Sequence, residues 1–342
     1  MQISLNRDVF LDSLSHVQGV IEKKSTLPIL SNVLIEARGS KACLTSTDLD
    51  MIFVEDMSVL ETTQEGSTTT SAIILYDIVR KLPIGSKIQL KLISESKLEI
   101  KSGNSKFNLL CLSPNDFPLS KEDFNVSVLE LDPKKLLKLI NKTKFSVSND
   151  ETRHYLNGIF LHKTKKDNDI FLTAASTDSH RMSVSNIRLN SDIQFDSIIL
   201  PKKTIFQLLS LLEGKTENIK IFNNKSKIKF ELKNCVLISK VIDGKFPNYN
   251  QVIPKNNNKK LEINLKDFIN SVDRVISVSS DRKEGVKMEL SNEMVRLSVN
   301  NPNSGDGSEI LKAKFNSEAM NISFNSKYIM DVASQIEDEN LI

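Results

Sequence analysis

The sequence contains few of the residues on which common kinds of functional site depend. None of its 342 residues is tryptophan, eleven are glycine, four are histidine and three are cysteine. So few glycines weigh against a nucleotide-binding protein built on glycine-rich loops, and no histidines have the spacing of metal ligands. The cysteines Cys43, Cys111 and Cys235 lie far apart in apolar, strand-like runs. We therefore expect buried free thiols in a reducing compartment, with no disulfide framework and no zinc site.

Long apolar runs and a strong excess of charge are also missing. No segment approaches the roughly 18 apolar residues of a membrane helix, and the N-terminus lacks the apolar core of a signal peptide, so we expect a cytoplasmic protein. The chain carries 46 basic and 43 acidic residues, for a formal net charge of +3. Binding to nucleic acid would therefore depend on where lysines cluster rather than on their total number.

One pattern of residues occurs three times along the chain. Each copy begins with a short strand of alternating apolar and polar residues. A helix-capping residue follows, which is Asn6, Asp132 or Asn264. Such side chains accept hydrogen bonds from the free N–H groups of a helix's first turn. Apolar residues follow with the 3.6-residue period of a helix. Because a repeat of this length is a whole domain, we predict domains at residues 1–125, 126–254 and 255–342.

Each repeat is predicted to contain two helices packed on antiparallel sheets, which is an α+β fold. In the first repeat, a turn at residues 38–40 joins two strands into a hairpin, and a second helix occupies residues 75–82. The second repeat replays this order. It is predicted to have a strand at Leu156–Leu161, a polar turn at Lys163–Asp169 and a helix from about Thr204 to Leu212.

The third repeat is shorter than the other two by internal comparison. Leu341 falls where Ile88 and Ile219 stand, at the opening of the closing strands of the earlier repeats. Those repeats continue for about thirty residues beyond this point. We therefore expect the third domain to be incomplete, without its closing strands.

Six segments, in the same order along the chain, carry a resemblance to a known family. They are residues 26–32, 47–51, 155–158, 177–182, 243–249 and 324–328. With the threefold repeat, they make the chain similar to the bacterial DNA polymerase III β subunits, the sliding clamps, over essentially its whole length. This resemblance implies a clamp fold in which each chain forms half of a closed ring. It also implies a homodimer that encircles duplex DNA without reading its sequence and gives the replicative polymerase processivity, with no cofactor, metal or membrane involved.

The resemblance implies that basic side chains face the DNA. The family's DNA-contacting loops match this chain at Lys24, Arg153, His154 and Tyr155. The candidates on predicted helices are Arg80, Lys81, Lys134, Lys135, Lys138, Lys142, Lys202 and Lys203. Lysines on a helix are also typical of an ordinary solvated surface, so the sequence alone leaves both interpretations open.

A peptide-binding groove between the second and third domains is also implied by the resemblance. In the family it takes a short Gln-Leu-x-Leu-Phe-like peptide from the polymerase III α subunit, the clamp loader and repair proteins. The matching positions are Leu156, Thr177, His180, Arg181, Met182, Pro247, Val252, Asn325 and Tyr328. This chain departs from the family's pattern at two places, with Ser179 where Gly is common and Gln251 where Arg is common.

The dimer interface implied by the resemblance joins the first domain of one copy to the third domain of the next. Phe107 and Leu109, on a first-domain strand, would meet Ser277 and Val278 of the neighbouring copy. The alternative is that Phe107 and Leu109 belong to the core of their own domain.

Two other functions are alternatives to the clamp. Asp178 and His180, with Ser176 or Ser179, suggest a hydrolase relay. They lie within five residues of one another, however, and no nucleophile elbow is present, so no catalytic residue is predicted. The second alternative is a three-domain scaffold that binds peptides and no DNA. Retention on nicked circular DNA, lost when the circle is cut, would separate a clamp from a scaffold.

Overall fold

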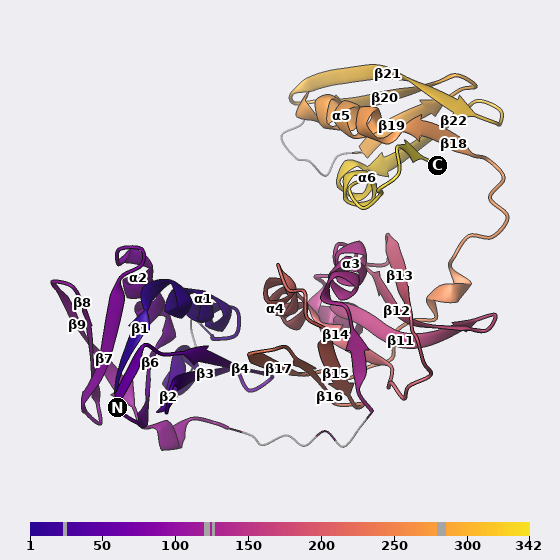
Figure 1. The fold of residues 1–342 in the computed structure, drawn as a ribbon. Coiled ribbons are helices and arrows are strands. Elements are labelled where there is room, and N and C mark those ends of the chain that lie inside the picture. Colours follow the sequence, from indigo (N-terminus) through magenta and orange to yellow (C-terminus); the bar gives the residue numbers. More distant parts are fainter. Residues whose placement is uncertain (23–25, 120–123, 125–126, 279–284) are drawn as a thin grey trace. The chain divides into compact units, whose positions relative to one another are not determined.

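The computed structural model describes residues 1–22, 26–119, 124, 127–278 and 285–342 (Figure 1). They form two compact units, Met1–Phe246 and Pro247–Ile342, and each is described by itself. The first unit contains the first two repeats, and the second unit contains the third. Helices and antiparallel strands occur in all three repeats, which confirms the predicted α+β class.

The first repeat has the predicted order of strand, helix, hairpin, helix and meander. Its helices are α1 (Arg7–Gln18) and α2 (Ala72–Lys81), with short 3-10 helices η1 (Pro28–Ser31) and η2 (Pro114–Asp116). Its strands are β1 (Gln2–Asn6), β2 (Asn32–Arg38), β3 (Lys41–Thr47), β4 (Met51–Ser58), β5 (Glu61–Gln64), β6 (Gly66–Ser71), β7 (Lys87–Ser94), β8 (Lys97–Ser102) and β9 (Ser105–Leu112).

The second repeat has the same plan. Its helices are α3 (Pro133–Lys144) and α4 (Lys202–Leu212), with 3-10 helices η3 (Glu151–Leu156) and, at the start of the second unit, η4 (Tyr249–Gln251). Its strands are β10 (Leu129–Leu131), β11 (Gly158–Lys166), β12 (Asp169–Thr177), β13 (Met182–Arg188), β14 (Ile198–Pro201), β15 (Ile219–Asn223), β16 (Lys227–Glu231) and β17 (Cys235–Lys240).

The third repeat forms most of the second unit. Its helices are α5 (Leu265–Val275) and α6 (Ser326–Ala333), with a 3-10 helix η5 (Ile276–Val278). Its strands are β18 (Leu261–Asn264), β19 (Gly285–Leu290), β20 (Met294–Asn301), β21 (Gly305–Phe315), β22 (Met320–Asn325) and β23 (Asn340–Leu341). They form one sheet in the order β22-β19-β20-β21-β18-β23.

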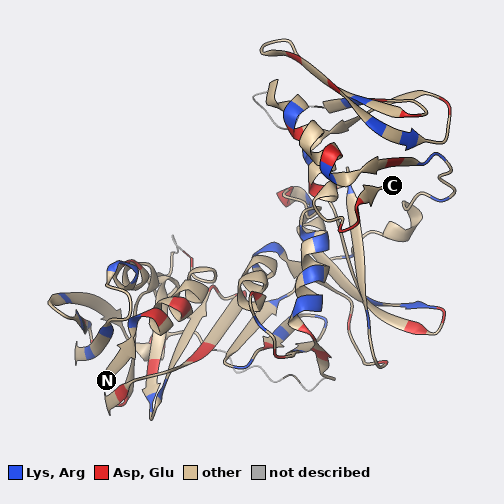
Figure 2. Cartoon of the chain, turned by 45° about the horizontal axis from the view of Figure 1, so that its top comes forward, with Lys and Arg blue, Asp and Glu red and all other residues tan. Residues whose placement is uncertain are grey.

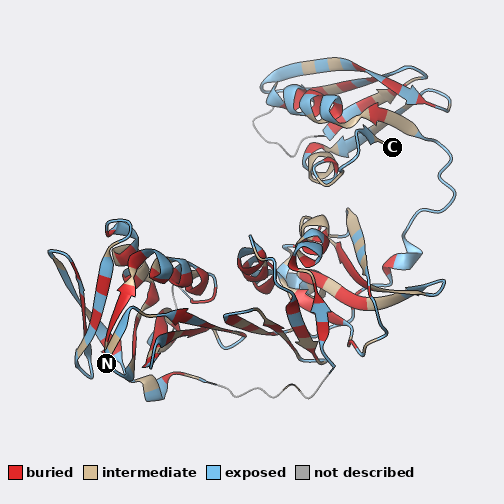
Figure 3. Cartoon of the chain, viewed as in Figure 1, coloured by how far each residue is buried: buried red, intermediate tan, exposed pale blue. Residues whose placement is uncertain are grey.

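The first helix of each repeat begins at its predicted cap. The side chains of Asn6, Asp132 and Asn264 each accept a hydrogen bond from a backbone N–H in the first turn, at 2.9, 2.8 and 3.1 Å. These bonds satisfy donors that have no partner inside the helix. Buried residues then follow on one side of each helix and along the strands (Figure 3).

The repeats also agree in strand register. In each repeat, the opening strand pairs with the strand that follows the second helix. The equivalent pairs are Leu5 with Ile88, Leu131 with Ile219, and Ile263 with Leu341. Leu341 therefore occupies the place that the sequence comparison predicts. A one-residue slip would turn every side chain of these strands to the opposite face, so the agreement supports one shared architecture for the three repeats.

Strands join the first two repeats directly. β17 pairs antiparallel with β4, with Cys235 opposite Glu55 and Ser239 opposite Met51. A 13-stranded sheet therefore runs through both repeats, in the order β10-β15-β16-β17-β4-β3-β2-β6-β9-β8-β7-β1-β5. The buried apolar side chains of both repeats belong to one continuous core. We call the contact between β17 and β4, with the helix ends beside it, the sheet joint.

A buried polar cluster lies at the sheet joint. The Glu55 carboxylate lies 3.0 Å from Nδ1 of His16 and accepts a hydrogen bond from Asn234 Nδ2 at 3.2 Å. Gln207 Nε2, from α4, donates to the backbone carbonyl of His16 at 2.9 Å. Glu55 is 2 % exposed. Because a buried polar group without partners is costly, these bonds help hold the second repeat in place on the first.

The three cysteines are free thiols, as expected, although only two are buried. Cys111 and Cys235 are buried, whereas Cys43 is half-buried. Burial, with the charge of Glu55 as the second cause, raises the pKa of the Cys235 thiol to about 12. A thiol with so high a pKa is a poor nucleophile at neutral pH.

Two predictions of local structure in the second repeat are wrong. The predicted turn at Lys163–Asp169 is mostly strand, because β11 runs to Lys166 and β12 begins at Asp169. Charged residues can occupy a strand end that projects into solvent, so polarity there does not mark a turn. The strand also begins two residues later than predicted, because Leu156 ends the 3-10 helix η3 and the strand starts at Gly158.

Candidate nucleic-acid and peptide interfaces

Helix α3 presents one apolar face and one basic face. Leu136, Leu139 and Ile140 are buried on the first face. Lys134, Lys135 and Lys138 are exposed, and Lys142 is half-buried. The helix contains no acidic residue, so no carboxylate of its own cancels this charge (Figure 2). The helix therefore offers phosphate-binding side chains on a rigid support.

The two predicted lysines of α4 differ in their surroundings. The Lys202 ammonium group donates to Asn149 Oδ1, a neutral amide, and keeps its net charge. The Lys203 ammonium group donates to the Val20 carbonyl at 2.7 Å and pairs with the Asp48 carboxylate. Val20 and Asp48 belong to the first repeat, so Lys203 lies in the sheet joint.

The predicted basic residues of the first repeat lie at the end of α2. Arg80 and Lys81 are both exposed in its last turn, where cations are favourable beside the helix dipole. Arg80 pairs with Asp77 at 3.0 Å and lies over the Tyr76 ring, 5.8 Å from its centroid. Lys24 lies outside the described residues.

The loop candidates Arg153, His154 and Tyr155 come together in η3. Arg153 Nε donates to the Asp150 carboxylate at 2.8 Å, and its Nη1 donates to Ser179 Oγ at 2.7 Å. Hydrogen bonds from Thr152, and then from Arg153, hold the pKa of Asp150 below its ordinary value. His154 and Tyr155 pack edge to face, with ring centroids 5.9 Å apart. Of the three, Arg153 is thus held by side-chain bonds in this loop.

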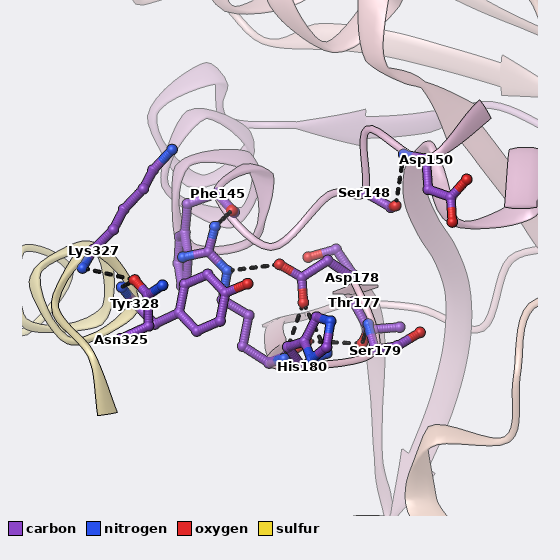
Figure 4. Close-up of polar contacts among 12 residues, drawn as sticks. Phe145, Ser148, Asp150, Thr177, Asp178, Ser179, His180, Asn325, Lys327 and Tyr328 are labelled. Carbon is purple, nitrogen blue, oxygen red and sulfur yellow. Dashed lines mark hydrogen bonds and ion pairs between the residues drawn. The ribbon is translucent and has the colours of Figure 1, made fainter. Parts of the chain in front are cut away.

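A turn of the same construction occurs in the first two repeats. In the second, Thr177 Oγ1 donates to the Arg181 carbonyl at 2.7 Å, and Asp178 Oδ1 accepts from the N–H groups of His180 and Arg181, both at 3.0 Å (Figure 4). In the first, the equivalent atoms of Thr47 and Asp48 make the equivalent bonds.

The third residue of this turn has left-handed backbone in both repeats. It is Leu49, with φ +75°, in the first repeat and Ser179, with φ +74°, in the second. Glycine adopts this region most easily, which accounts for the family's common Gly at the position of Ser179. In this chain, the hydrogen bonds of the Thr177 and Asp178 side chains hold the turn in place although the third residue is not glycine.

Arg181 is fixed at the base of this turn. Its Nε donates to Asp178 Oδ2 at 3.0 Å, its Nη2 donates to the Phe145 carbonyl, and its guanidinium lies 5.4 Å from the centroid of the Phe145 ring (Figure 4). Leu156 is buried, Met182 is half-buried and His180 is exposed. The turn therefore presents an ordered arginine and an exposed imidazole from the first unit.

The geometry of the turn does not suit a hydrolase relay. The Asp178 carboxylate accepts from backbone N–H groups and from Arg181, and no bond joins it to the His180 ring among the described residues. Ser176 Oγ donates instead to the Thr143 carbonyl in the interior. Asp178 therefore shapes the turn.

The remaining groove candidates belong to the second unit. Asn325 caps α6, where its Oδ1 accepts from the N–H groups of Lys327 at 3.0 Å and Tyr328 at 3.4 Å. Tyr328 is half-buried, and Pro247 and Val252 are exposed, Val252 by 68 %. Neighbouring Ile253 is also exposed. This unit thus offers exposed apolar side chains near its start and a tyrosine at the start of α6.

The strand β9 carries the predicted first-domain side of the dimer interface. It pairs with β8 along Ser105–Leu110 and with β6 only at Cys111 and Leu112. Along Ser105–Leu110, no other described strand pairs with its second edge. Phe107 is 37 % exposed, whereas Leu109 packs partly against the core. The core alternative therefore fits Leu109 better than Phe107.

Sequence reasoning missed the most exposed apolar residue of this strand. Leu110 is 84 % exposed, and Leu112, on the same face, is 41 % exposed. Because side chains alternate between the two faces of a strand, Leu110 and Leu112 must lie on the face opposite Leu109 and Cys111. This alternation could have shown that one of the two faces is exposed. The predicted third-domain residues Ser277 and Val278 lie in η5, directly after α5, and Val278 lies beside Gly307 of β21.

Neither a membrane span nor a metal cluster is found in the described part of the chain. No helix there is long and apolar enough to cross a membrane. Among the residues that the structure describes, no group of three or more His, Cys, Asp or Glu side chains is close enough to hold a metal ion.

The chain matches family models of the DNA polymerase III beta subunit along nearly its whole length. The N-terminal domain matches residues 1–121, the central domain residues 130–248 and the C-terminal domain residues 250–341. The beta sliding clamp of Caulobacter vibrioides is 36% identical over 338 residues, which cover 98% of this chain and 91% of the relative. That of Escherichia coli is 31% identical over 342 residues, which cover 100% of this chain and 92% of the relative.

Solved structures agree with these matches. A sliding clamp from Bartonella birtlesii, bound to griselimycin, superposes with a TM-score of 0.94 at 39% identity, over 99% of this chain and 91% of that one. A beta sliding clamp from Caulobacter crescentus superposes with a TM-score of 0.95 at 35% identity, over the same shares.

Proposed function

The chain belongs to the DNA polymerase III beta subunit family, the sliding clamps, and we propose that two copies close into a ring around duplex DNA. The family is the non-catalytic processivity factor of DNA polymerase III. A closed ring holds DNA by topology, so it stays on the duplex without gripping any sequence. The polymerase that it tethers then stays on the template.

The observation that carries this proposal is the sheet joint. β17, the last meander strand of the second repeat, pairs with β4 of the first. β9 holds the equivalent place in the first repeat, and its edge along Ser105–Leu110 has no described partner. β21 holds the place of β4 in the third repeat, since it pairs with β20 as β4 pairs with β3. We infer that β9 of one copy pairs with β21 of the next.

The helix ends beside the sheet joint support the same assignment. Gly19 and Val20, just after α1, lie against α4, where Val20 accepts a hydrogen bond from Lys203 and Gly19 contacts Gln207. Ser277 and Val278 lie as many residues after the cap Asn264 as Gly19 and Val20 lie after the cap Asn6, so the two pairs hold equivalent positions. They would therefore meet the start of α2 of the next copy, where Ile74 is 51 % exposed, whereas Phe107 and Leu109 on β9 would lie beside β21 and not directly against Ser277 and Val278.

The basic face of α3 is the proposed inner surface of the ring. Lysine side chains there would contact phosphates, which carry no sequence information. Such contacts are weak and interchangeable, so the ring can slide. Lys202, Arg80, Lys81 and the η3 residues Arg153, His154 and Tyr155 would extend this surface.

The proposed partner-binding residues of the first unit are the Thr177–Met182 turn and Leu156. Those of the second unit are Pro247, Val252, Asn325 and Tyr328. Two observations support this role. The turn is ordered by its own hydrogen bonds, and the second unit leaves apolar side chains exposed near its start. Buried apolar anchors with a polar rim are the usual basis of peptide recognition. The proposed ligands are peptides of the polymerase III α subunit, the clamp loader and other proteins with the clamp-binding motif.

The test of ring function is retention on DNA of different topology. The protein is placed on nicked circular DNA by a clamp loader, and free protein is removed by gel filtration. We expect it to remain with the circle and to be released when a restriction enzyme cuts the circle once. Equal retention on circular and cut DNA would contradict a ring. No retention on either would favour the scaffold that binds peptides alone.

The charge of α3 can be tested separately from ring closure. A Lys134→Glu/Lys135→Glu/Lys138→Glu variant is expected to bind duplex DNA at least about tenfold more weakly at moderate salt. The slope of log affinity against log salt concentration should fall by about 2–3, because each phosphate contact contributes close to one. Fluorescence anisotropy with labelled duplex measures both quantities.

The matched control changes three exposed lysines elsewhere, as Lys91→Glu/Lys220→Glu/Lys225→Glu. It alters the net charge by the same amount and should change the slope much less. Equal loss in the two variants would mean that overall charge, and not the face of α3, governs binding.

A further inference from the structure

The strand that opens each repeat has different neighbours in the three repeats. β1 lies between β5 and β7, and β18 lies between β21 and β23. β10 pairs with β15 on one side, and none of the described strands pairs with its other side. The second repeat thus leaves open a strand edge that the same protein covers in the other two.

The backbone of this open edge is directed outward at Glu130. In an antiparallel ladder, the N–H and C=O of one residue point to the same side, and the side alternates along the strand. In the first repeat, the Ser4 carbonyl accepts from Leu60 N–H at 2.8 Å on the β5 side. Glu130 stands at the position of Ser4, one residue before the paired Leu131 and Leu5. Its N–H and C=O therefore face the open side.

A cavity of about 480 Å³ lies along this edge. Leu129 and Leu131 of β10 line it, together with Ile187, Leu189 and Ile193. The chain after β13 does not form a strand here. Its position is held by Lys163, whose ammonium group donates to the Asp192 carboxylate at 2.6 Å and to the Ile193 carbonyl. The place of β5 in the first repeat is therefore a cavity in the second. Leucine and isoleucine side chains form part of its wall, and polar or charged residues, among them Asp132, Lys135 and Arg188, form the rest.

The third repeat shows which side chains suit this place. There, Lys314 of β21 stands opposite Glu262, and its ammonium group lies 3.7 Å from the Glu262 carboxylate. Ala313 and Phe315, on either side of Lys314, are buried. Glu130 occupies the position of Glu262, is exposed and has no ion-pair partner among the described residues. The complementary segment is thus apolar, basic and apolar in turn.

We propose that the open edge of β10 binds an extended segment of a partner protein, antiparallel to β10, with the pattern apolar–Lys/Arg–apolar. The basic residue pairs with Glu130, the two apolar residues enter the cavity, and backbone hydrogen bonds form with Glu130. This is strand addition to a sheet edge, in which the backbone gives affinity and alternate side chains give specificity. The site lies within the first unit and does not depend on the groove or on ring closure.

The test uses a synthetic peptide with the sequence of residues 311–317, Leu-Lys-Ala-Lys-Phe-Asn-Ser, labelled with fluorescein and titrated with the full chain. We expect saturable binding that weakens at least about tenfold in a Glu130→Lys variant, where like charges stand opposite each other. N-methylation of the second peptide lysine should abolish binding, because it removes the backbone donor. A peptide with Glu at that position should bind Glu130→Lys better than it binds the unaltered chain.

A control and three outcomes separate this proposal from others. Glu213→Lys, an exposed change of the same charge after α4, should bind the peptide like the unaltered chain. Absence of binding, or equal binding to Glu130→Lys, would overturn the proposal. Self-association that Glu130→Lys abolishes, without peptide binding, would also overturn it, because the occupant would then be a second copy. Retention on circular DNA should be unchanged in Glu130→Lys, so the two proposals can fail independently.

Discussion

A Phe107→Asp/Leu110→Asp variant is expected to be a monomer at concentrations at which the unaltered protein is a dimer. Both side chains are exposed on β9, the strand that we propose to pair with β21 of the next copy. Truncating a central apolar residue of an interface costs about 2–4 kcal/mol, which corresponds to a roughly 30- to 1,000-fold weaker dimer. Carboxylates at these positions would also have to be desolvated. Sedimentation equilibrium across a dilution series measures the dissociation constant.

The matched control for this variant is Ile84→Asp. Ile84 is 85 % exposed, nearly the same as Leu110, but lies in the loop after α2 and is not part of β9. It should leave the dissociation constant unchanged. If the double variant dimerises as tightly as the control, β9 is not the interface. Loss of retention on circular DNA should accompany loss of the dimer.

A Glu55→Ala variant is expected to lose about 3 kcal/mol of unfolding free energy. The change leaves His16 buried without the carboxylate that it contacts and removes the acceptor of the Asn234 side chain. Breaking a buried pair by removing one partner costs about 3–5 kcal/mol. For a unit of this size, the melting temperature should fall by about 6–12 °C. Differential scanning calorimetry gives this value directly.

Two further variants at the sheet joint show whether burial is the cause. Asp50→Ala breaks the pair between Asp50 and Lys240, which are 2.9 Å apart and both exposed, and should cost less than about 1 kcal/mol. Glu55→Gln keeps a hydrogen-bonding oxygen and should fall between the other two. A Glu55→Ala protein as stable as Asp50→Ala would show that the buried cluster contributes no more than a surface pair.

The features that local chemistry determines were predictable from the sequence. Asn6, Asp132 and Asn264 begin helices because an Asn or Asp side chain can accept a hydrogen bond from the first turn wherever the chain goes next. The register of Leu5, Leu131 and Ile263 was also predictable, because the repeats can be compared with one another and a single slip would expose the core face.

Elements that depend on partners distant in the sequence were missed. β6 reads Gly-Ser-Thr-Thr-Thr-Ser, which shows no apolar alternation, yet Thr68, Thr69 and Thr70 are all buried. The hydroxyl of Thr69 donates to the Leu112 carbonyl at 2.9 Å, and that of Thr70 to the Leu110 carbonyl at 3.0 Å. These bonds with β9 offset the free-energy cost of burying the polar side chains of β6. The sequence of β6 alone does not show them.

The candidate sites divide in the same way. The sequence indicates the basic face of α3, because four lysines alternate with apolar residues at helical spacing. It could not show that Lys203 pairs with Asp48, because those residues are 155 positions apart. It also could not show the edge of β10 that no described strand covers, since this depends on the path of the chain after β13, where Lys163 binds the Ile193 carbonyl.

The sheet shared by the first two repeats affects how the protein unfolds locally. Because β17 and β4 are hydrogen-bonded to each other, peeling either strand away exposes unsatisfied amides of the other. Slow-exchanging amides of the two strands should therefore gain deuterium together, as one cooperative segment, although they come from two evolutionary copies of the fold. Neither copy can then be exchanged for a foreign one unless the new edge matches its neighbour strand for strand.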